Sequence, residues 1–318
     1  MSRATPPRTG DADGTPVPAS QAVPYIPAAT ETPRMPGRPR RALMPDACDA
    51  HCHVFGPYDR FPLRHPSSYA APDAPAERYL AMLDTLGARR GVLVQPAPYG
   101  TDPVALLDAL RLGGDRLRGV AVADPDVGDA QLQAWHDGGV RALRFVEARD
   151  PAGRLFPGSV GFDQIAALAP RMKQHGLHAQ LWAPCDVYAR HLPALARLGL
   201  TLVIDHLGSL VPARGPQDAV FQLMRGLLAD GALWMKLTLC RVGKAPDYAD
   251  ARYLHDAFVA ANPDQVLWGS DWPYVRMGDK APAADALLDL AWDWLGSDAL
   301  RRKVWVDNPA RLYGFPGG

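Results

Sequence analysis

The sequence predicts an α/β protein, a single-domain (β/α)₈ TIM barrel that follows an extended N-terminal arm. Helix-like segments alternate with short apolar runs, and parallel strands need such crossovers. Right-handed crossovers close eight strand–helix units into a barrel. Eight runs rich in apolar and β-branched residues are the candidate strands: 47–55, 91–95, 119–124, 142–146, 179–183, 200–206, 233–238 and 266–271.

The segments between the runs have helical character, and several end at a glycine, as helices prefer. An open doubly wound sheet is the alternative fold, but its first strand usually leads into GxGxxG. Here the first run leads into His51-Cys52-His53-Val54-Phe55-Gly56-Pro57, which cannot cradle a phosphate, so the barrel is favoured. The predicted helices are 76–87, 103–113, 129–138, 162–176 and 219–231, with 283–295 and 303–313 completing the outer ring.

Residues 1–45 differ from the rest of the chain. They hold ten of the 32 prolines and the basic stretch Arg38-Pro39-Arg40-Arg41, and they lack the apolar core of a secretory signal. Scattered proline favours extended backbone. We therefore expect an arm at 1–45, disordered or wrapped over the surface, and a barrel at 46–318.

Composition excludes several functions. The 34 Lys and Arg residues balance the 34 Asp and Glu residues, so the basic field that nucleic-acid or anionic-membrane binding needs is missing. No run of about 18 apolar residues could span a membrane. Four cysteines without a CxxC pair predict reduced thiols and a cytoplasmic protein. The expected partner is a small molecule, and homo-oligomerisation stays open.

In such a barrel, chemistry lies at the carboxyl ends of the strands. His51 and His53 end the first run, and side chains at i and i+2 of a strand share a face. Two imidazoles at the barrel mouth could hold a metal or polarise a carbonyl. A pair of hydrogen-bonded structural histidines is the alternative, which this position disfavours.

His206 and Asp271 end two further runs at the same mouth. A lone histidine is more often a satisfied core residue, but His206 is expected to converge with His51 and His53. Asp271 precedes Trp272, and burial beside tryptophan would raise the pKa of the carboxyl toward that of a usable base. Capping of the next helix is the alternative role for Asp271.

Arginines and tyrosines form a second group near the strand ends. A planar guanidinium suits bidentate binding of carboxylates, which makes Arg144, Arg149 and Arg241 candidate substrate ligands, with Arg276 after the last run as a further candidate. Pairing with neighbouring carboxylates is the alternative for each arginine. Tyr69 and Tyr274 could supply neutral donors.

The motif set resembles the amidohydrolase superfamily, in particular its branch of pyrone-dicarboxylate and sugar-acid lactonases. The resemblance covers about residues 46–313 and rests on DAHCHVFGP, FPLRHPSSY, GVAVADP, GVRALRF, LVIDHLG, VLWGSDWP and DNPARLY.

The resemblance implies a barrel that hydrolyses carboxylate-bearing lactones. Asp271 would take a proton from water, while His51, His53 and His206 would polarise the lactone carbonyl. Substrate contacts would come from Arg144, Arg149, Arg241, Tyr69, Trp182 and Tyr274.

The sequence departs from the metal-dependent members of the superfamily. Gln180-Leu181-Trp182 stands where they place a histidine, Arg144 stands where many have lysine, and His178 lies at the opposite end of its strand. A binuclear centre is therefore not expected, and no cofactor is expected to be required. One Zn²⁺ on His51, His53, His206 and Asp271 is the alternative.

Two further functions stay open beside lactone hydrolysis. The first is a mononuclear zinc-dependent decarboxylase of an aromatic or muconate-type acid, which would use the same four residues. The second is a catalytically silent sugar-acid sensor, which the presence of all four candidate reacting residues disfavours.

Overall fold

The computed structural model describes residues 28 and 32–316, which contain eight parallel strands in one sheet whose order in space follows the chain. Each strand overlaps one predicted run, so the predicted number and order of strands are confirmed. The strands are β1 (Cys48–Cys52), β2 (Arg90–Val94), β3 (Leu117–Ala121), β4 (Val140–Val146), β5 (His178–Trp182), β6 (Leu202–Ile204), β7 (Trp234–Lys236) and β8 (Val266–Leu267).

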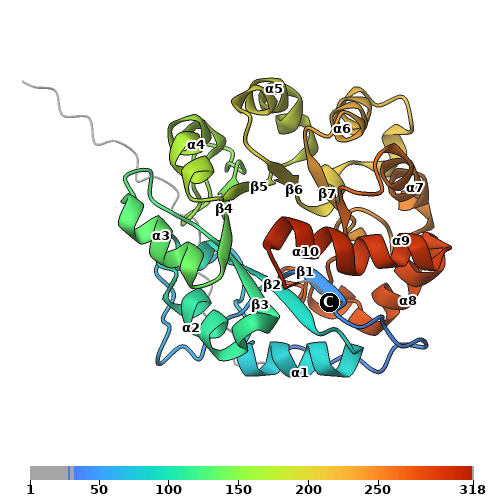
Figure 1. The fold of residues 1–318 in the computed structure, drawn as a ribbon, viewed down its shortest axis with the longest axis horizontal. Helices are drawn as coiled ribbons and strands as arrows, with labels where there is room; N and C mark the ends of the chain where they lie inside the picture. Colours follow the sequence, from blue (N-terminus) through green and yellow to red (C-terminus); the bar gives the residue numbers. More distant parts are fainter. Residues whose placement is uncertain (1–27, 29–31, 317–318) are drawn as a thin grey trace, which may run out of the picture.

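Backbone hydrogen bonds between the first strand and the segment at and after β8 close the sheet. The Ala50 N–H donates to the Trp268 carbonyl at 2.9 Å, and the Asp271 N–H donates to the His51 carbonyl at 2.8 Å. Figure 1 shows the strands at the centre with helices around them. The predicted TIM barrel is confirmed.

The described residues contain the seven predicted helices and three more, α5, α7 and α9. The predicted helix at 303–313 does not complete the outer ring, because α10 lies across the end of the barrel (Figure 1) and packs Tyr313 against the strands. Helix α5 carries an internal proline, Pro193, which weakens its helical signal. The helices are α1 (Ala76–Leu86), α2 (Val104–Gly113), α3 (Asp129–Asp137), α4 (Ile165–Gln174), α5 (Cys185–Leu195), α6 (Ala219–Ala229), α7 (Arg252–Ala261), α8 (Ala284–Leu295), α9 (Asp298–Arg302) and α10 (Asn308–Tyr313).

The amino-terminal end of the barrel is closed by the last residues of the chain, which lie over β1 in Figure 1. Tyr313 and Phe315 pack into a cluster with side chains of the strands. Arg90 donates to the Pro316 carbonyl at 2.6 Å, and Arg118 donates to the Gly314 carbonyl at 3.1 Å. Both guanidinium groups also lie over the Phe315 ring, at 5.3 and 4.7 Å from its centroid.

His178 belongs to this end of the barrel, as the sequence predicts. It is the first residue of β5 and is buried, with its ring centroid 5.2 Å from that of Tyr313. Burial lowers the pKa of His178 to about 3, so the imidazole is neutral at physiological pH. Because His178 lies at the amino-terminal end of the barrel, it cannot reach a metal at the mouth.

The residues just before the barrel contact its helices. The Arg40 Nε lies 3.0 Å from an Asp289 carboxylate oxygen, and Arg41 Nη1 lies 2.7 Å from one of Asp293, both on α8. Arg78 of α1 donates to the Pro33 carbonyl at 2.7 Å. Most of the predicted arm, 1–27 and 29–31, lies outside the described residues, and the division at residue 45 stays a prediction.

Two predictions from composition can be compared with the structure. Every helix among residues 28 and 32–316 is too short or too polar to cross a membrane. The four cysteines are buried and form no disulfide, as their spacing predicts.

Candidate active site

An irregularity in β1 aims His51 at the interior. Asp49 faces the helix layer, where its carboxylate accepts a hydrogen bond from Tyr79 of α1 at 3.2 Å. Strict alternation would place His51 on that same face, but the register of β1 against β2 shifts between Asp49 and Cys52. His51 instead contacts Lys236 and Asp205 inside the barrel.

Asp49 also ties the ends of the first and last strands together. Its carboxylate accepts from the backbone N–H of Ser270 at 2.8 Å and from the Ser270 hydroxyl at 2.6 Å. The Ser270 hydroxyl in turn accepts from the Trp272 N–H at 3.1 Å. Asp271 is thus held between two anchored residues.

The backbone is strained at two strand ends. His206 and Asp271 both adopt the left-handed region, with φ of 54° and 63°. For residues other than glycine this conformation costs on the order of 1 kcal/mol and is concentrated at functional sites. Gly269 permits the close approach of this segment to β1, because a Cβ there would lie 2.6 Å from the His51 Cβ.

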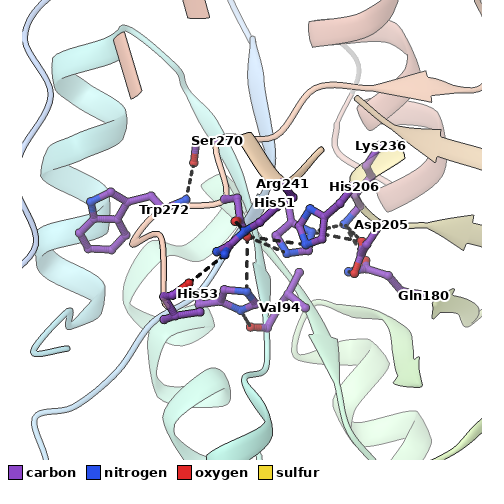
Figure 2. A network of polar contacts seen from close by, with 12 residues as sticks. His51, His53, Val94, Gln180, Asp205, His206, Lys236, Arg241, Ser270 and Trp272 are labelled. Atoms are coloured by element: carbon purple, nitrogen blue, oxygen red, sulfur yellow. Dashed lines mark hydrogen bonds and ion pairs between the residues drawn. The ribbon is translucent and has the colours of Figure 1, made fainter. Parts of the chain in front are cut away.

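Three imidazole nitrogens converge on one carboxylate oxygen (Figure 2). The Asp271 Oδ1 lies 3.5 Å from the Nε2 of His51, 3.7 Å from that of His53 and 3.8 Å from that of His206. The Asp271 Oδ1 is buried and has no hydrogen-bond partner among the described residues. The predicted convergence of the four residues is therefore present.

The other carboxylate oxygen of Asp271 accepts a hydrogen bond from the Arg241 Nε. Arg241 is held in turn by the Val275 carbonyl, 2.8 Å from its Nη1. Burial raises the pKa of Asp271 and the Arg241 charge opposes that effect, with a net shift upward. One oxygen is thus neutralised by a cation while its neighbour stays available.

The three histidines are neutral, because burial lowers the pKa of each. For His53 the pKa falls to about 3. Its Nδ1 lies 2.7 Å from the Val94 carbonyl, an acceptor only, so Nδ1 carries the proton. The Nε2 of His53 is therefore a lone pair directed toward Asp271.

A polar layer lies beneath His51. Lys236 Nζ lies 3.1 Å from the His51 Nδ1, 2.7 Å from the Gln180 carbonyl oxygen and 3.4 Å from an Asp205 oxygen. Gln180 also donates to Asp205 at 3.2 Å. Burial lowers the pKa of Lys236 to about 8, and the Asp205 charge limits that fall. The Nδ1 of His51 also lies 3.2 Å from an Asp205 carboxylate oxygen, so a hydrogen-bond donor and an acceptor both face this nitrogen.

A cavity opens from Asp271 to the surface and encloses about 760 Å³, its open mouth included. Among the predicted site residues, those that line it are His53, Tyr69, Arg144, Trp182, His206, Arg241 and Asp271.

Three predicted site residues do not line the cavity. His51 is fully buried behind the wall and reaches the site through Asp271. Arg149 bonds instead to Glu147, with 2.6 Å between Nε and the carboxylate. Tyr274 is buried beside the turn that follows Asp271. We therefore retain no substrate contact for Arg149 or Tyr274.

The structure adds cavity residues that the sequence did not single out as ligands: Phe156, Pro157 and Ser159 from the long loop after β4, and Ser68 after β1. It also places Arg276, which follows β8, at the cavity. Loops at this end of a barrel carry binding groups, so the length of the β4 loop was an available signal. Which side chains of that loop turn inward could not be predicted from the sequence.

Part of this convergence also fits a divalent cation. Ligand atoms of His51, His53 and Asp271 all lie within 4.8 Å of one another, and His206 lies outside that group although its Nε2 is 3.8 Å from the Asp271 Oδ1. The lone pair on His53 and the unpartnered Oδ1 of Asp271 suit such an ion.

The barrel and its His-X-His mouth define an amidohydrolase. The amidohydrolase family model matches residues 48–315, and the chain belongs to that family.

Characterised relatives resemble most of the chain. It is 32% identical to the 2-pyrone-4,6-dicarboxylate hydrolase of Comamonas testosteroni, over 87% of this chain and 93% of the relative. It is 34% identical to the 4-sulfomuconolactone hydrolase of Rhizobium radiobacter, over 86% of this chain and 91% of the relative. A crystal structure described as a putative 2-pyrone-4,6-dicarboxylic acid hydrolase of Pseudomonas putida is 31% identical, with a TM-score of 0.74, covering 87% of this chain and 100% of that one.

Proposed function

We propose that this protein hydrolyses a carboxylate-bearing lactone by attack of an Asp271-activated water on the ring ester carbonyl. The observation that carries the proposal is the unpartnered Asp271 Oδ1, buried at the inner wall of a cavity that three arginines line. Relatives that match nearly the whole chain are named as hydrolases of carboxylated or sulfonated lactones, which supports the same reaction class.

The arginines orient the substrate. Arg144 and Arg241 line the cavity beside Asp271, and each charge-assisted hydrogen bond to a carboxylate contributes roughly 1.5–3 kcal/mol. Tyr69 and Trp182 supply aromatic walls. Binding energy is thereby used to hold the ester carbonyl against the attacking water.

Asp271 acts as the general base. Its free oxygen takes one proton of the water, and the lone pair on His53 Nε2 accepts a hydrogen bond from the other. The new C–O bond forms as negative charge develops on the carbonyl oxygen, which His206 at the cavity wall stabilises as a hydrogen-bond donor. Asp271 then returns the proton to the ring oxygen as the ring C–O bond breaks.

His51 acts from behind this wall. Its Nδ1 contacts Lys236 at 3.1 Å, and its Nε2 lies 3.5 Å from the Asp271 carboxylate, so it positions that carboxylate. If a divalent cation is bound, His51, His53, His206 and Asp271 would hold it, and it would supply Lewis-acid polarisation of the carbonyl.

The test is acid release by the purified full-length protein from 2-pyrone-4,6-dicarboxylate, muconolactone and an aldonolactone, each with and without chelator. We expect turnover of the carboxylated lactones that survives chelation. Turnover of none of the three would refute the proposal. Activity that is lost on chelation and restored by Zn²⁺ would refute metal-independent chemistry while leaving the reaction class.

The group of His51, His53 and Asp271, whose ligand atoms all lie within 4.8 Å of one another, favours one second candidate, a mononuclear zinc-dependent decarboxylase. Carbon dioxide release from an aromatic or muconate-type acid, with about one zinc bound per chain, would establish it against lactone hydrolysis.

A further inference from the structure

Three arginines line the cavity, but two already have partners. Arg241 is paired with Asp271 and with the Val275 carbonyl. Arg144 donates to the Gln95 carbonyl at 3.0 Å and lies 4.0 Å from an Asp205 oxygen. Asp271 is the one carboxylate among the residues that line the cavity, so its lining carries excess positive charge.

Arg276 is the third arginine, and it differs from the other two. It follows β8 in a left-handed conformation with φ of 68°, and no carboxylate of the described residues lies within ion-pair distance of it. Its guanidinium donates to the Ser68 hydroxyl. Burial and the nearby Arg241 charge lower the pKa of Arg276, and Tyr69 opposes them.

Two aromatic rings hold Arg276 in place. The guanidinium carbon lies 5.3 Å from the Tyr69 ring centroid and 5.2 Å from that of Phe156, which come from the loops after β1 and β4. Such contacts position a cation without neutralising it. A guanidinium fixed in advance loses less conformational entropy when it binds an anion.

A second unsatisfied group lines the same cavity. The Ser159 hydroxyl is buried and has no hydrogen-bond partner among the described residues. A buried hydroxyl without a partner is unfavourable, because it has lost its hydrogen bonds to water. The cavity thus offers a free donor in addition to an unpaired cation.

We propose that Arg276, with Ser68 and Ser159, forms a second anion subsite that binds a second negatively charged group of the lactone, a carboxylate or a sulfonate. This inference rests on the proposed function. Arg144 and Arg241 hold one anionic group beside Asp271, and Arg276 holds the other, so the cavity selects dianionic over monoanionic lactones.

The test compares matched substrates. 2-Pyrone-4,6-dicarboxylate is measured against the two 2-pyrones that carry a single carboxylate, at C4 or at C6, and 4-sulfomuconolactone against muconolactone. The variants are Arg276→Met, which keeps apolar contact with the rings, and Arg276→Lys, which keeps the charge. Arg149→Met removes a positive charge from the same end of the barrel but outside the cavity and serves as the control.

We expect Arg276→Met to lower the kcat/KM ratio of dianionic over monoanionic substrate about 10- to 100-fold, the value of one charge-assisted contact. Most of the loss should be in KM. Arg276→Lys should keep part of the wild-type preference for dianionic substrates, and Arg149→Met should keep all of it. If Arg276→Met slows both substrate classes equally, Arg276 only staples the loops together and the inference fails.

Calorimetric binding separates the inference from the proposed function. If no lactone is turned over but the dicarboxylate binds more tightly than the monocarboxylates, and only Arg276→Met removes that difference, the subsite stands and the hydrolase proposal fails. If the wild type binds all three pyrones equally, the inference fails whatever the activity. A larger loss for the carboxylate or for the sulfonate pair shows which anion the subsite prefers.

Discussion

The two ends of the barrel differ in what surrounds their buried polar groups. At the amino-terminal end, Arg90 and Arg118 donate to backbone carbonyls of the closing segment and stack on Phe315. At the mouth, the Asp271 Oδ1 has no partner and the Arg276 guanidinium has no carboxylate. At both ends some buried polar atoms lack a hydrogen-bond partner among the described residues, as do Arg90 Nη1 and Arg118 Nε at the closed end. Asp271 and Arg276 differ from these because they line the cavity, where a ligand can reach them.

Two buried, neutral histidines, His178 at the amino-terminal end and His53 at the mouth, differ in the same way. Burial lowers the pKa of His53 and of His178 to about 3 in both cases. The ring of His178 packs against Tyr313, while His53 directs a lone pair toward Asp271 across the cavity wall. A perturbed pKa therefore does not by itself identify a site, and the position along the barrel axis does.

The largest expected effect is at the mouth. Asp271→Asn should lower kcat by roughly 10²–10⁴, because a general base is lost. Stopped-flow or steady-state acid release measures it. Asp124→Asn, the same change at the exposed residue just beyond β3, should leave kcat unaltered; a similar loss in both variants would contradict the assignment of the base.

The corresponding change at the closed end should affect folding and spare activity. Phe315→Ala removes a ring that packs against two guanidinium groups, and truncation of a buried phenylalanine costs about 3–5 kcal/mol. Urea titration measures the free energy of unfolding, with KM and kcat followed in parallel. An unchanged stability would show that this end is not a stabilising closure.

The pH dependence of the unfolding free energy should report on His178 at the amino-terminal end of the barrel. The pKa of His178 is lower in the folded than in the unfolded state, so its contribution is present above about pH 6.5 and is lost as the pH falls toward 3. His178→Gln should therefore flatten the fall in unfolding free energy between pH 6.5 and 4. Identical acid profiles of variant and wild type would contradict a buried neutral His178.

The smallest expected effect sharpens the boundary of the site. Arg149→Met should change kcat/KM by no more than about twofold, as for a surface substitution away from the site. Its partner is Glu147, not the cavity. A tenfold rise in KM would restore the substrate-binding role that the sequence predicted for Arg149.

Much of the fold and of the candidate site could be predicted from the sequence, because the signals are local. Apolar runs at strand length and glycine-ended helices placed eight strands, and the last polar residues of those strands gave His51, His53, His206 and Asp271. Arg149 and Tyr274 were predicted as substrate contacts from motif position, but neither is among the residues that line the cavity. Arg276, which follows the last strand, does line it.

The sequence by itself determined the barrel, the end that carries chemistry and the four converging side chains, since hydrophobic period and strand termini depend on neighbouring residues. The tertiary structure alone decided the shift in β1 that aims His51 inward, the carbonyl that fixes the proton of His53, and the rings that hold Arg276. Each of these depends on a partner distant in the chain, and the direction and charge state of a polar group are set by such partners rather than by its own segment.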